Sequence, residues 1–292
     1  MVPFTHMLLA SLVILLAGSV ISAPLKADPV KVELVSSVGS VTPGTPFTVG
    51  VVFKIEKGWH IYWKFAGDAG LPPEIHWKLP EGWKTGDIQW PIPTRFTEKG
   101  PLTTYGYSDS VMLLTEITPP ATSTEKAVML TAAVDWMVCQ EECVPGKGTF
   151  SVSLPVGAST TSPNPGQATN SRRIDTWRNS LPSQVQGTGI RIGSESSRSN
   201  PMSKIAQVKL TFLLPKGASM SNMAFYPNPG KDLAVKKIVT SVIDGNPVIK
   251  FNLQSFKEPM VSRTRIEGLV VYTDASGKRR GLTLTPPIVF DE

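Results

Sequence analysis

Short apolar, β-branched runs separated by glycine, proline and polar residues recur along this chain. A valine-rich run begins at Val30, a turn with Pro43, Gly44 and Pro46 follows it, and a second such run covers Phe47–Ile55. Runs of this length between turn residues predict β-strands. The chain therefore opens like an immunoglobulin-type sandwich, and its pattern favours an all-β fold.

The most informative pattern is a predicted hairpin that carries both cysteines of the chain. Residues 128–138, VMLTAAVDWMV, are β-branched and apolar and predict a strand that ends at Cys139. Residues 140–148 hold Pro145 and two glycines, which indicate a turn, and residues 149–156 alternate as a half-buried return strand. Cys143 is thus expected in the loop. A bent loop can bring two Cα atoms to the ~5.5 Å that a disulfide needs, whereas a continuous strand would hold them ~13 Å apart.

The second half of the chain predicts a separate β domain. Residues 157–202 have linker composition, and the stretch IDTWRNSL within them could hold one or two helical turns. Residues 203–292 form a second β pattern with an Asp-Gly hairpin signal, and they contain neither cysteine nor histidine. We therefore expect an immunoglobulin-like sandwich over residues 30–156, followed by a second, smaller β-sandwich-like domain with a supporting or docking role.

Composition agrees with a two-domain globular protein that is exported. The 292 residues are 41% hydrophobic and 18% charged, with 24 Gly and 26 Pro. Residues 1–23 have an apolar core followed by small residues, which predicts a signal peptide cleaved near Ala23 or Ala27. Because no Lys or Arg precedes the apolar core, retention of this segment as a membrane anchor is the alternative. No later apolar stretch approaches the ~18 residues of a membrane span.

Charge is distributed unevenly between the two halves. Residues 1–170 carry 11 Lys and Arg against 14 Asp and Glu, whereas residues 171–292 carry 18 against 9. A basic half can contact anionic lipid or an acidic partner. Its cations are scattered, however, and no nucleic-acid motif accompanies them. A solvated surface is the better interpretation, and no nucleic-acid partner is expected.

Two cysteines in an exported protein have an ordinary explanation, which is a structural disulfide that staples a hairpin. So short a loop constrains the unfolded chain little, and this weakens the explanation. The C-x-x-x-C spacing also differs from the C-x-x-C of thioredoxin. Asp135, Glu141 and Glu142 disfavour a thiolate nearby, so the pair should give up electrons readily and act as a reductant or relay.

Metal binding is a further alternative. Cys139, Cys143, Met137 and His60 could hold a soft ion such as Cu(I). The chain has no paired metal-ligand spacing, so we assign no metal ligand. No cofactor motif is present either, and we assign no cofactor. A hydrolase is unsupported, because the sequence has no G-x-S-x-G and few histidines.

Four separated motifs resemble one known family. They are GWHIYWKFAGDAGLPPEIHW, GDIQWPIPTRF, a loop that ends in TYGY, and DWMVCQEECVP, in that order. Together they closely resemble the amino-terminal periplasmic domain of thiol:disulfide interchange proteins of the DsbD and ScsB type, over about residues 30 to 156. The carboxy-terminal β region also resembles, more weakly, the second module of ScsB-like members.

The resemblance implies an immunoglobulin-like fold in which Cys139 and Cys143 are a redox pair. The family's domain receives electrons from a membrane-embedded partner domain and passes them to oxidised periplasmic proteins. The family's transmembrane and thioredoxin-like portions are not recognised in this sequence. The resemblance therefore implies a stand-alone form, which needs a separate membrane-embedded electron donor of the DsbD or ScsB type.

The resemblance also implies a cap loop that shields the cysteines and swings aside for partners. Here that loop would be residues 99–107, and the residues implied at the site are Thr104, Tyr105, Gly106, Tyr107, Tyr62 and His60. Thr104 stands where DsbD has a capping phenylalanine, so shielding by that residue would differ here. Gly106 is expected at a turn, where glycine permits a backbone conformation that would strain other residues.

Dithiol–disulfide exchange is therefore the function we expect from the sequence. One thiolate would attack a partner's disulfide and the other cysteine would resolve the mixed disulfide. Cys143, as the loop cysteine, is the expected attacking residue, although the resemblance also allows Cys139. The alternatives are a non-enzymatic binding or assembly module with a structural disulfide, and a Cu(I)-handling protein.

Overall fold

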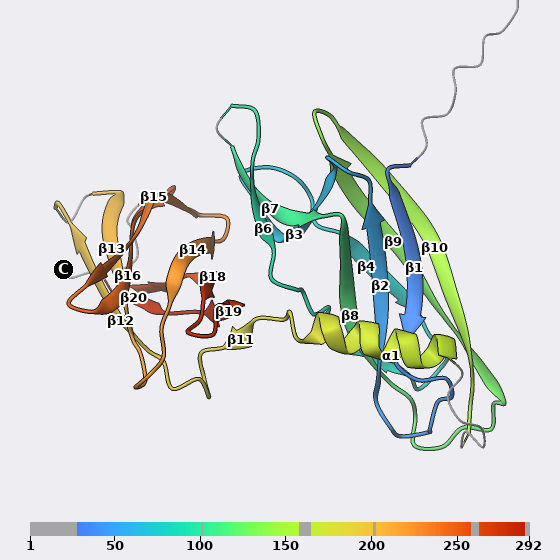
Figure 1. Ribbon diagram of the computed structural model, residues 1–292. Helices are drawn as coiled ribbons and strands as arrows, with labels where there is room; N and C mark the ends of the chain where they lie inside the picture. The colour runs from blue at the N-terminus through green and yellow to red at the C-terminus, as the bar shows by residue number, and fades with distance from the viewer. Residues whose placement is uncertain (1–27, 101, 158–164, 201–202, 258–262, 290–292) are drawn as a thin grey trace, which may run out of the picture.

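The computed structural model describes residues 28–289, except residues 101, 158–164, 201–202 and 258–262. Two β-sandwiches follow one another, and the segment between them contains one helix (Figure 1). The predicted signal peptide and its cleavage positions lie outside the described residues. Within the described part of the chain, no helix is both long enough and apolar enough to cross a membrane.

The first sandwich consists of two antiparallel sheets. One has the strand order β1-β2-β8-β5, and the other has the order β10-β9-β3-β7-β6, with β4 paired to β9. Their strands are β1 (Val30–Ser36), β2 (Phe47–Ile55), β3 (His60–Gly67), β4 (Glu74–Lys78), β5 (Lys84–Thr85), β6 (Thr94–Thr97), β7 (Thr103–Ser108), β8 (Ser110–Thr118), β9 (Ala127–Cys139) and β10 (Cys143–Pro155).

The central strands of the first sheet are buried on both faces. On the inner face, Phe53 of β2 packs edge-on against Trp136 of β9, with the ring centroids 6.1 Å apart. On the outer face, helix α1 (Pro165–Arg178) lies across the sheet and buries Ile174 against Val52 and Met112. This second layer explains why β2 is a nearly continuous apolar run instead of an alternating one.

The β9–β10 hairpin differs from its prediction at the turn. Cys143 is not in a loop, because it is the first residue of β10 and pairs directly with Cys139. The turn is confined to residues 140–142. Pro145 is tolerated within β10 because this strand lies at the edge of its sheet, where a backbone N–H can remain unpaired. Gly146 leaves room for the ring of Trp136, which would lie 2.3 Å from an added Cβ.

The second sandwich packs a sheet of order β11-β19-β18-β14 against one of order β12-β13-β16-β15, and β17 pairs with β20. The Asp-Gly sequence forms the turn of the predicted hairpin, which joins β15 and β16, and both Asp244 and Gly245 have positive φ. The strands of the second sandwich are β11 (Ser183–Gln184), β12 (Arg191–Arg198), β13 (Ile205–Leu213), β14 (Ser221–Asn228), β15 (Leu233–Ile243), β16 (Asn246–Ser255), β17 (Arg263–Arg265), β18 (Glu267–Thr273), β19 (Arg279–Leu284) and β20 (Pro287–Val289).

The segment predicted as a linker, residues 157–202, contains more structure than expected. Helix α1 has 14 residues instead of one or two turns. Strands β11 and β12 also fall within this segment, and β12 pairs with β13 along its whole length. Strand β12 is an edge strand with few buried side chains, and its sequence RIGSESSR is mostly polar. It therefore lacks the apolar alternation from which a strand can be predicted.

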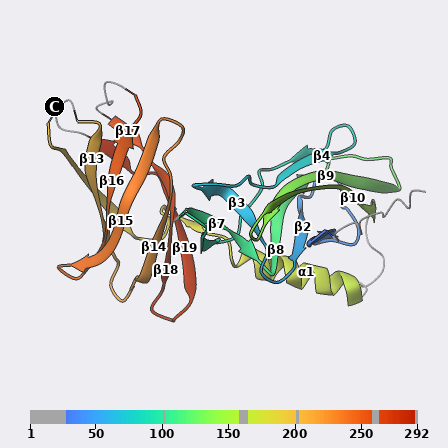
Figure 2. The ribbon, with the colours of Figure 1, turned by 90° about the horizontal axis from the view of Figure 1, so that it is seen from above.

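Strands β3 and β7 of the first sandwich meet the outer face of the β11-β19-β18-β14 sheet of the second sandwich (Figure 2). Tyr226 of β14 and Leu269 of β18 belong to the same buried cluster as Trp63 and Tyr105 of the first sandwich. Lys64 forms an ion pair of 2.9 Å with Glu267 across the contact. The fold is thus all-β, as predicted, with an immunoglobulin-like sandwich followed by a second β-sandwich.

Candidate functional site

The two cysteines form a disulfide at the end of the β9–β10 hairpin, with their Cα atoms 4.1 Å apart. Cys139 is only 2% exposed, because β10 lies on one side of it and β3 pairs with it on the other through His60. Cys143 is exposed, since it begins an edge strand. The bond therefore presents one sulfur to solvent and keeps the other inside the sheet.

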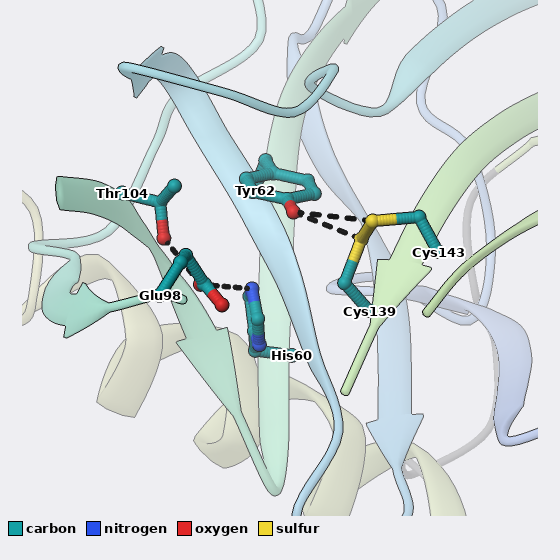
Figure 3. The surroundings of a disulfide bond; sticks show 6 residues. All are labelled: His60, Tyr62, Glu98, Thr104, Cys139 and Cys143. Atoms are coloured by element: carbon teal, nitrogen blue, oxygen red, sulfur yellow. Dashed lines mark hydrogen bonds and ion pairs between the residues drawn. A yellow bond between two sulfur atoms is a disulfide. The ribbon is translucent and has the colours of Figure 1, made fainter. Parts of the chain in front are cut away.

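Tyr62 directs its hydroxyl group at the disulfide (Figure 3). The hydroxyl oxygen lies 2.8 Å from Sγ of Cys139 and 3.8 Å from Sγ of Cys143. Burial, supported by the negative charge of Glu98, raises the pKa of Tyr62 to about 12. The phenol is therefore neutral near pH 7 and can donate a hydrogen bond to the buried sulfur.

Gly70 makes room for the ring of Tyr62. Its φ is +96°, and a Cβ built at this position would lie 2.2 Å from the Tyr62 ring. Both its backbone conformation and its contact with the ring therefore require glycine. The sequence motif that contains Gly70 thus helps to place the tyrosine hydroxyl at the sulfur.

His60, Glu98 and Thr104 form a polar cluster beside Tyr62 (Figure 3). His60 Nε2 lies 3.1 Å from Glu98 Oε1, although the two atoms are not aligned as a hydrogen bond. The hydroxyl of Thr104 donates to the same carboxylate oxygen at 2.8 Å. Phe96 stacks on the imidazole with the ring centroids 4.5 Å apart. These contacts connect β3 to both strands of the β6–β7 hairpin.

The predicted cap-loop residues divide between two faces. Thr104 approaches the cluster beside the disulfide, whereas Tyr105 stacks on Tyr226 of the second sandwich. Tyr107 donates its hydroxyl to the carbonyl of Pro91 at 2.7 Å and is buried. These residues belong to β7 and not to a loop, because only residues 98–102 connect the two strands of this hairpin.

Gly106 also has a different role from the one predicted. It lies within β7 opposite Tyr62, and its φ is not positive. A Cβ built there would lie 2.0 Å from the carbonyl oxygen of Ile61. The glycine is therefore needed because two backbones approach closely, and not because a turn requires a left-handed conformation.

Sequence reasoning missed Glu98 and Phe96. Both lie in or next to β6, within or just after the motif that ends in TRF, and each contacts His60. A carboxylate near a loop is ordinarily solvated, so the position of Glu98 in the sequence did not indicate a role in the site. Lys99, by contrast, pairs with Glu141 of the hairpin turn at 3.4 Å, but both side chains are about four-fifths exposed, so the pair stabilises the loop little.

The Cu(I) alternative would use both cysteine sulfurs as ligands. The cysteine sulfurs are bonded to each other. Across the described ranges of the chain, no group of three or more His, Cys, Asp or Glu side chains is placed to hold an ion.

His60 should make folding stability sensitive to acid. Burial lowers the pKa of His60 below its ordinary 6.5, against the opposing attraction of Glu98. The unfolded chain therefore takes up this proton near pH 6.5, whereas the folded protein takes it up only at lower pH. The stability contributed by this difference is complete above pH 6.5 and is lost as the pH falls below that value.

We expect His60→Gln to lose less unfolding free energy than the unmodified protein between about pH 7.5 and about pH 5.5. Urea unfolding followed by tryptophan fluorescence measures this difference, since all seven tryptophans lie in residues 59–177. Carboxylates away from His60 contribute the same loss of unfolding free energy in both proteins, so their contributions cancel in the comparison. An equal loss of stability in the two proteins would show that His60 does not contribute to the acid sensitivity.

The geometry defines a class of protein domain. An immunoglobulin-like sandwich holds a disulfide between one exposed and one buried sulfur, with a neutral tyrosine hydroxyl at the buried one. Residues 26–155 match the family model described as "Thiol:disulfide interchange protein DsbD, N-terminal". This part of the chain is a DsbD/ScsB-type amino-terminal domain, as its motifs predicted.

One solved structure extends the likeness in fold over both sandwiches. The N-terminal periplasmic domain of ScsB from Proteus mirabilis is 16% identical, with a TM-score of 0.61 over 91% of this chain and 96% of that chain. A conserved domain protein from Bacillus anthracis is 10% identical over 91% of this chain and 88% of that chain, with a TM-score of only 0.23. No curated protein sequence matches this chain.

Proposed function

We propose that this chain is a periplasmic dithiol–disulfide exchange protein that relays electrons from a membrane-embedded DsbD/ScsB-type reductase to oxidised envelope proteins. In this proposal Cys139 and Cys143 are the catalytic pair, residues 30–156 form the redox domain, and residues 203–292 form a second domain that supports it. The single observation that carries the proposal is the asymmetry of the disulfide, in which the exposed Cys143 can be attacked while Cys139 receives a hydrogen bond from Tyr62.

The geometry supports a definite sequence of steps for loading the domain with electrons. A donor thiolate attacks Sγ of Cys143, the sulfur–sulfur bond breaks, and Cys139 leaves as a thiolate that Tyr62 stabilises. The second thiolate of the donor then attacks the donor sulfur of the mixed disulfide and releases Cys143. Two electrons enter the domain, and the two cysteine thiolates take up protons from water.

Delivery to an oxidised envelope protein follows the same steps in reverse. The thiolate of Cys143 attacks the partner's disulfide and forms a mixed disulfide, which the thiolate of Cys139 resolves. Glu141 and Glu142, which directly precede Cys143 in the hairpin turn, disfavour a resting thiolate at that sulfur. A cysteine whose thiolate is disfavoured releases its electrons more readily, which supports the direction from this domain to its partners.

Exchange activity requires the bond to open while the domain stays folded, and reduction kinetics test this requirement. We expect dithiothreitol to release two thiols at a rate that does not change with urea below the unfolding transition, because Cys143 is already exposed. The reduced domain should lose at most about 2 kcal/mol of unfolding free energy, since the bond closes a very short loop. Thiol titration and tryptophan fluorescence give the two quantities.

The contrary result would identify a structural staple. If thiols appear only as urea populates the unfolded state, opening requires unfolding and the relay proposal fails. A chain with both cysteines replaced by serine, unfolded in the same urea series, supplies the stability of a domain without the bond. The reduced protein should match it closely.

A further inference from the structure

Strands β3 and β7 each have one face toward the disulfide and the other toward the buried core of the first sandwich, which Tyr226 of the second sandwich joins. On β3, Tyr62 reaches Cys139 while the next residue, Trp63, packs against Tyr226. On β7, Thr104 reaches the polar cluster beside the disulfide while Tyr105 stacks on Tyr226. Adjacent residues of a strand point to opposite faces, so contacts on the core side can fix the positions of side chains on the site side.

The pairing of these two strands is interrupted beside Tyr62. The ladder runs from His60 to Tyr62, which is opposite Gly106, and it resumes only where Gly67 lies opposite Thr104. Four residues of β3, 63–66, thus stand against the single residue Tyr105 of β7. Backbone hydrogen bonds of the regular ladder therefore do not hold β3 against β7 in this interval.

Tyr226 bridges the two strands at this interruption. Its ring stacks on Tyr105 with centroids 4.5 Å apart and meets Trp63 edge-on at 6.4 Å. It is 4% exposed, and its burial raises the pKa of Tyr226 against the opposing effect of the positive charge of Arg279. Arg279 in turn donates to the carbonyl groups of Ile92 and Pro93, just before β6. One residue of the second sandwich thus contacts both strands and is linked to the start of a third.

We propose that Tyr226 is a positioning residue for the exchange reaction. By holding β3 against β7 where their pairing lapses, it keeps the hydroxyl of Tyr62 at Sγ of Cys139 and so stabilises the departing thiolate. The second sandwich is therefore part of the reaction machinery and not only an attached module. This inference rests on the proposed function of Cys139 and Cys143.

Rates of disulfide opening by dithiothreitol in the folded, full-length chain test the inference. Attack on the exposed Cys143 needs no change in access, so the rate reports on stabilisation of the departing Cys139 thiolate. Tyr62→Phe removes a hydrogen bond to a charged group and should slow opening about tenfold. Tyr226→Ala should slow it about fivefold, because part of that same hydrogen bond is lost.

The double variant separates positioning from simple packing. If Tyr226 acts through Tyr62, the variant with both Tyr62→Phe and Tyr226→Ala opens no more slowly than Tyr62→Phe alone. Tyr226→Phe keeps the stacked ring and should open at nearly the unmodified rate. Tyr272→Ala removes the ring of a partly buried tyrosine that packs against the core of the second sandwich, and it should leave the rate unchanged.

Two results would overturn the inference without touching the proposed function. One is an unchanged opening rate in Tyr226→Ala, and the other is a slowing that multiplies fully with that of Tyr62→Phe. Should Tyr226→Ala fail to fold, Tyr226→Leu retains apolar volume without an aromatic ring and carries the same expectation. If instead the unmodified bond does not open in the folded chain, the proposed function itself fails.

Discussion

Replacing Cys139 with serine should trap a covalent complex through Cys143, whereas replacing Cys143 should trap none. Cys143 is exposed at the start of an edge strand, and Cys139 is 2% exposed behind the hydroxyl of Tyr62. In Cys139→Ser the attacking sulfur remains and the resolving sulfur is missing, so the mixed disulfide persists. In Cys143→Ser the remaining sulfur cannot reach a protein disulfide.

The measurement is non-reducing electrophoresis with mass spectrometry after incubation with an oxidised protein that has a solvent-exposed disulfide. Both single variants should lose complete turnover, since each lacks one half of the pair. The chain with both cysteines replaced by serine controls for non-specific association. Accumulation of the complex in Cys143→Ser but not in Cys139→Ser would reverse the assignment of the attacking sulfur.

The sequence predicted the hairpin correctly but misplaced its turn. Proline and glycine indicate turns on average, yet Pro145 fits an edge strand and Gly146 lies beneath the Trp136 ring. These roles depend on which strand is an edge and on what packs over it, and neither is a local property. The Asp-Gly turn at residues 244–245 was predictable because its two positive φ values are a local requirement.

The candidate site could be predicted only in part, because some of its residues depend on contacts that are not local in sequence. The resemblance placed Tyr62 and His60 beside the sulfurs, and the structure brings both there. Alternation along β7 does place Tyr105 and Tyr107 on one face, but no local pattern says which face meets the disulfide. Glu98 had no signal, because its role depends on His60, a residue distant in sequence.

The role of the second sandwich was the least accessible to sequence reasoning. Tyr226 lies in an ordinary strand with no motif, and its importance comes from a gap in pairing between β3 and β7 in the other sandwich. Such a gap depends on the register of two strands far apart in the chain. A supporting or docking role was therefore the furthest conclusion that composition allowed.

Gly106→Ala should destabilise the first sandwich by about 3 kcal/mol and also slow disulfide opening. The added Cβ would lie 2.0 Å from the carbonyl oxygen of Ile61 and 3.2 Å from Cα of Tyr62, so backbone and not a flexible side chain must move. The β7 strand would shift away from β3 at the last regular pair before the interruption, Tyr62 opposite Gly106. The hydroxyl of Tyr62 would then move relative to Cys139.

Urea unfolding by tryptophan fluorescence gives the stability, and thiol release gives the opening rate. Gly86→Ala is the matched control, because it lies in the same sandwich, has no positive φ, and would place its Cβ no closer than 3.7 Å to any neighbour. It should change unfolding free energy by less than about 0.5 kcal/mol. If Gly106→Ala changed the unfolding free energy as little as Gly86→Ala, β3 and β7 could separate without loss of stability. A fixed spacing between β3 and β7 would then not be what holds Tyr62 at the sulfur.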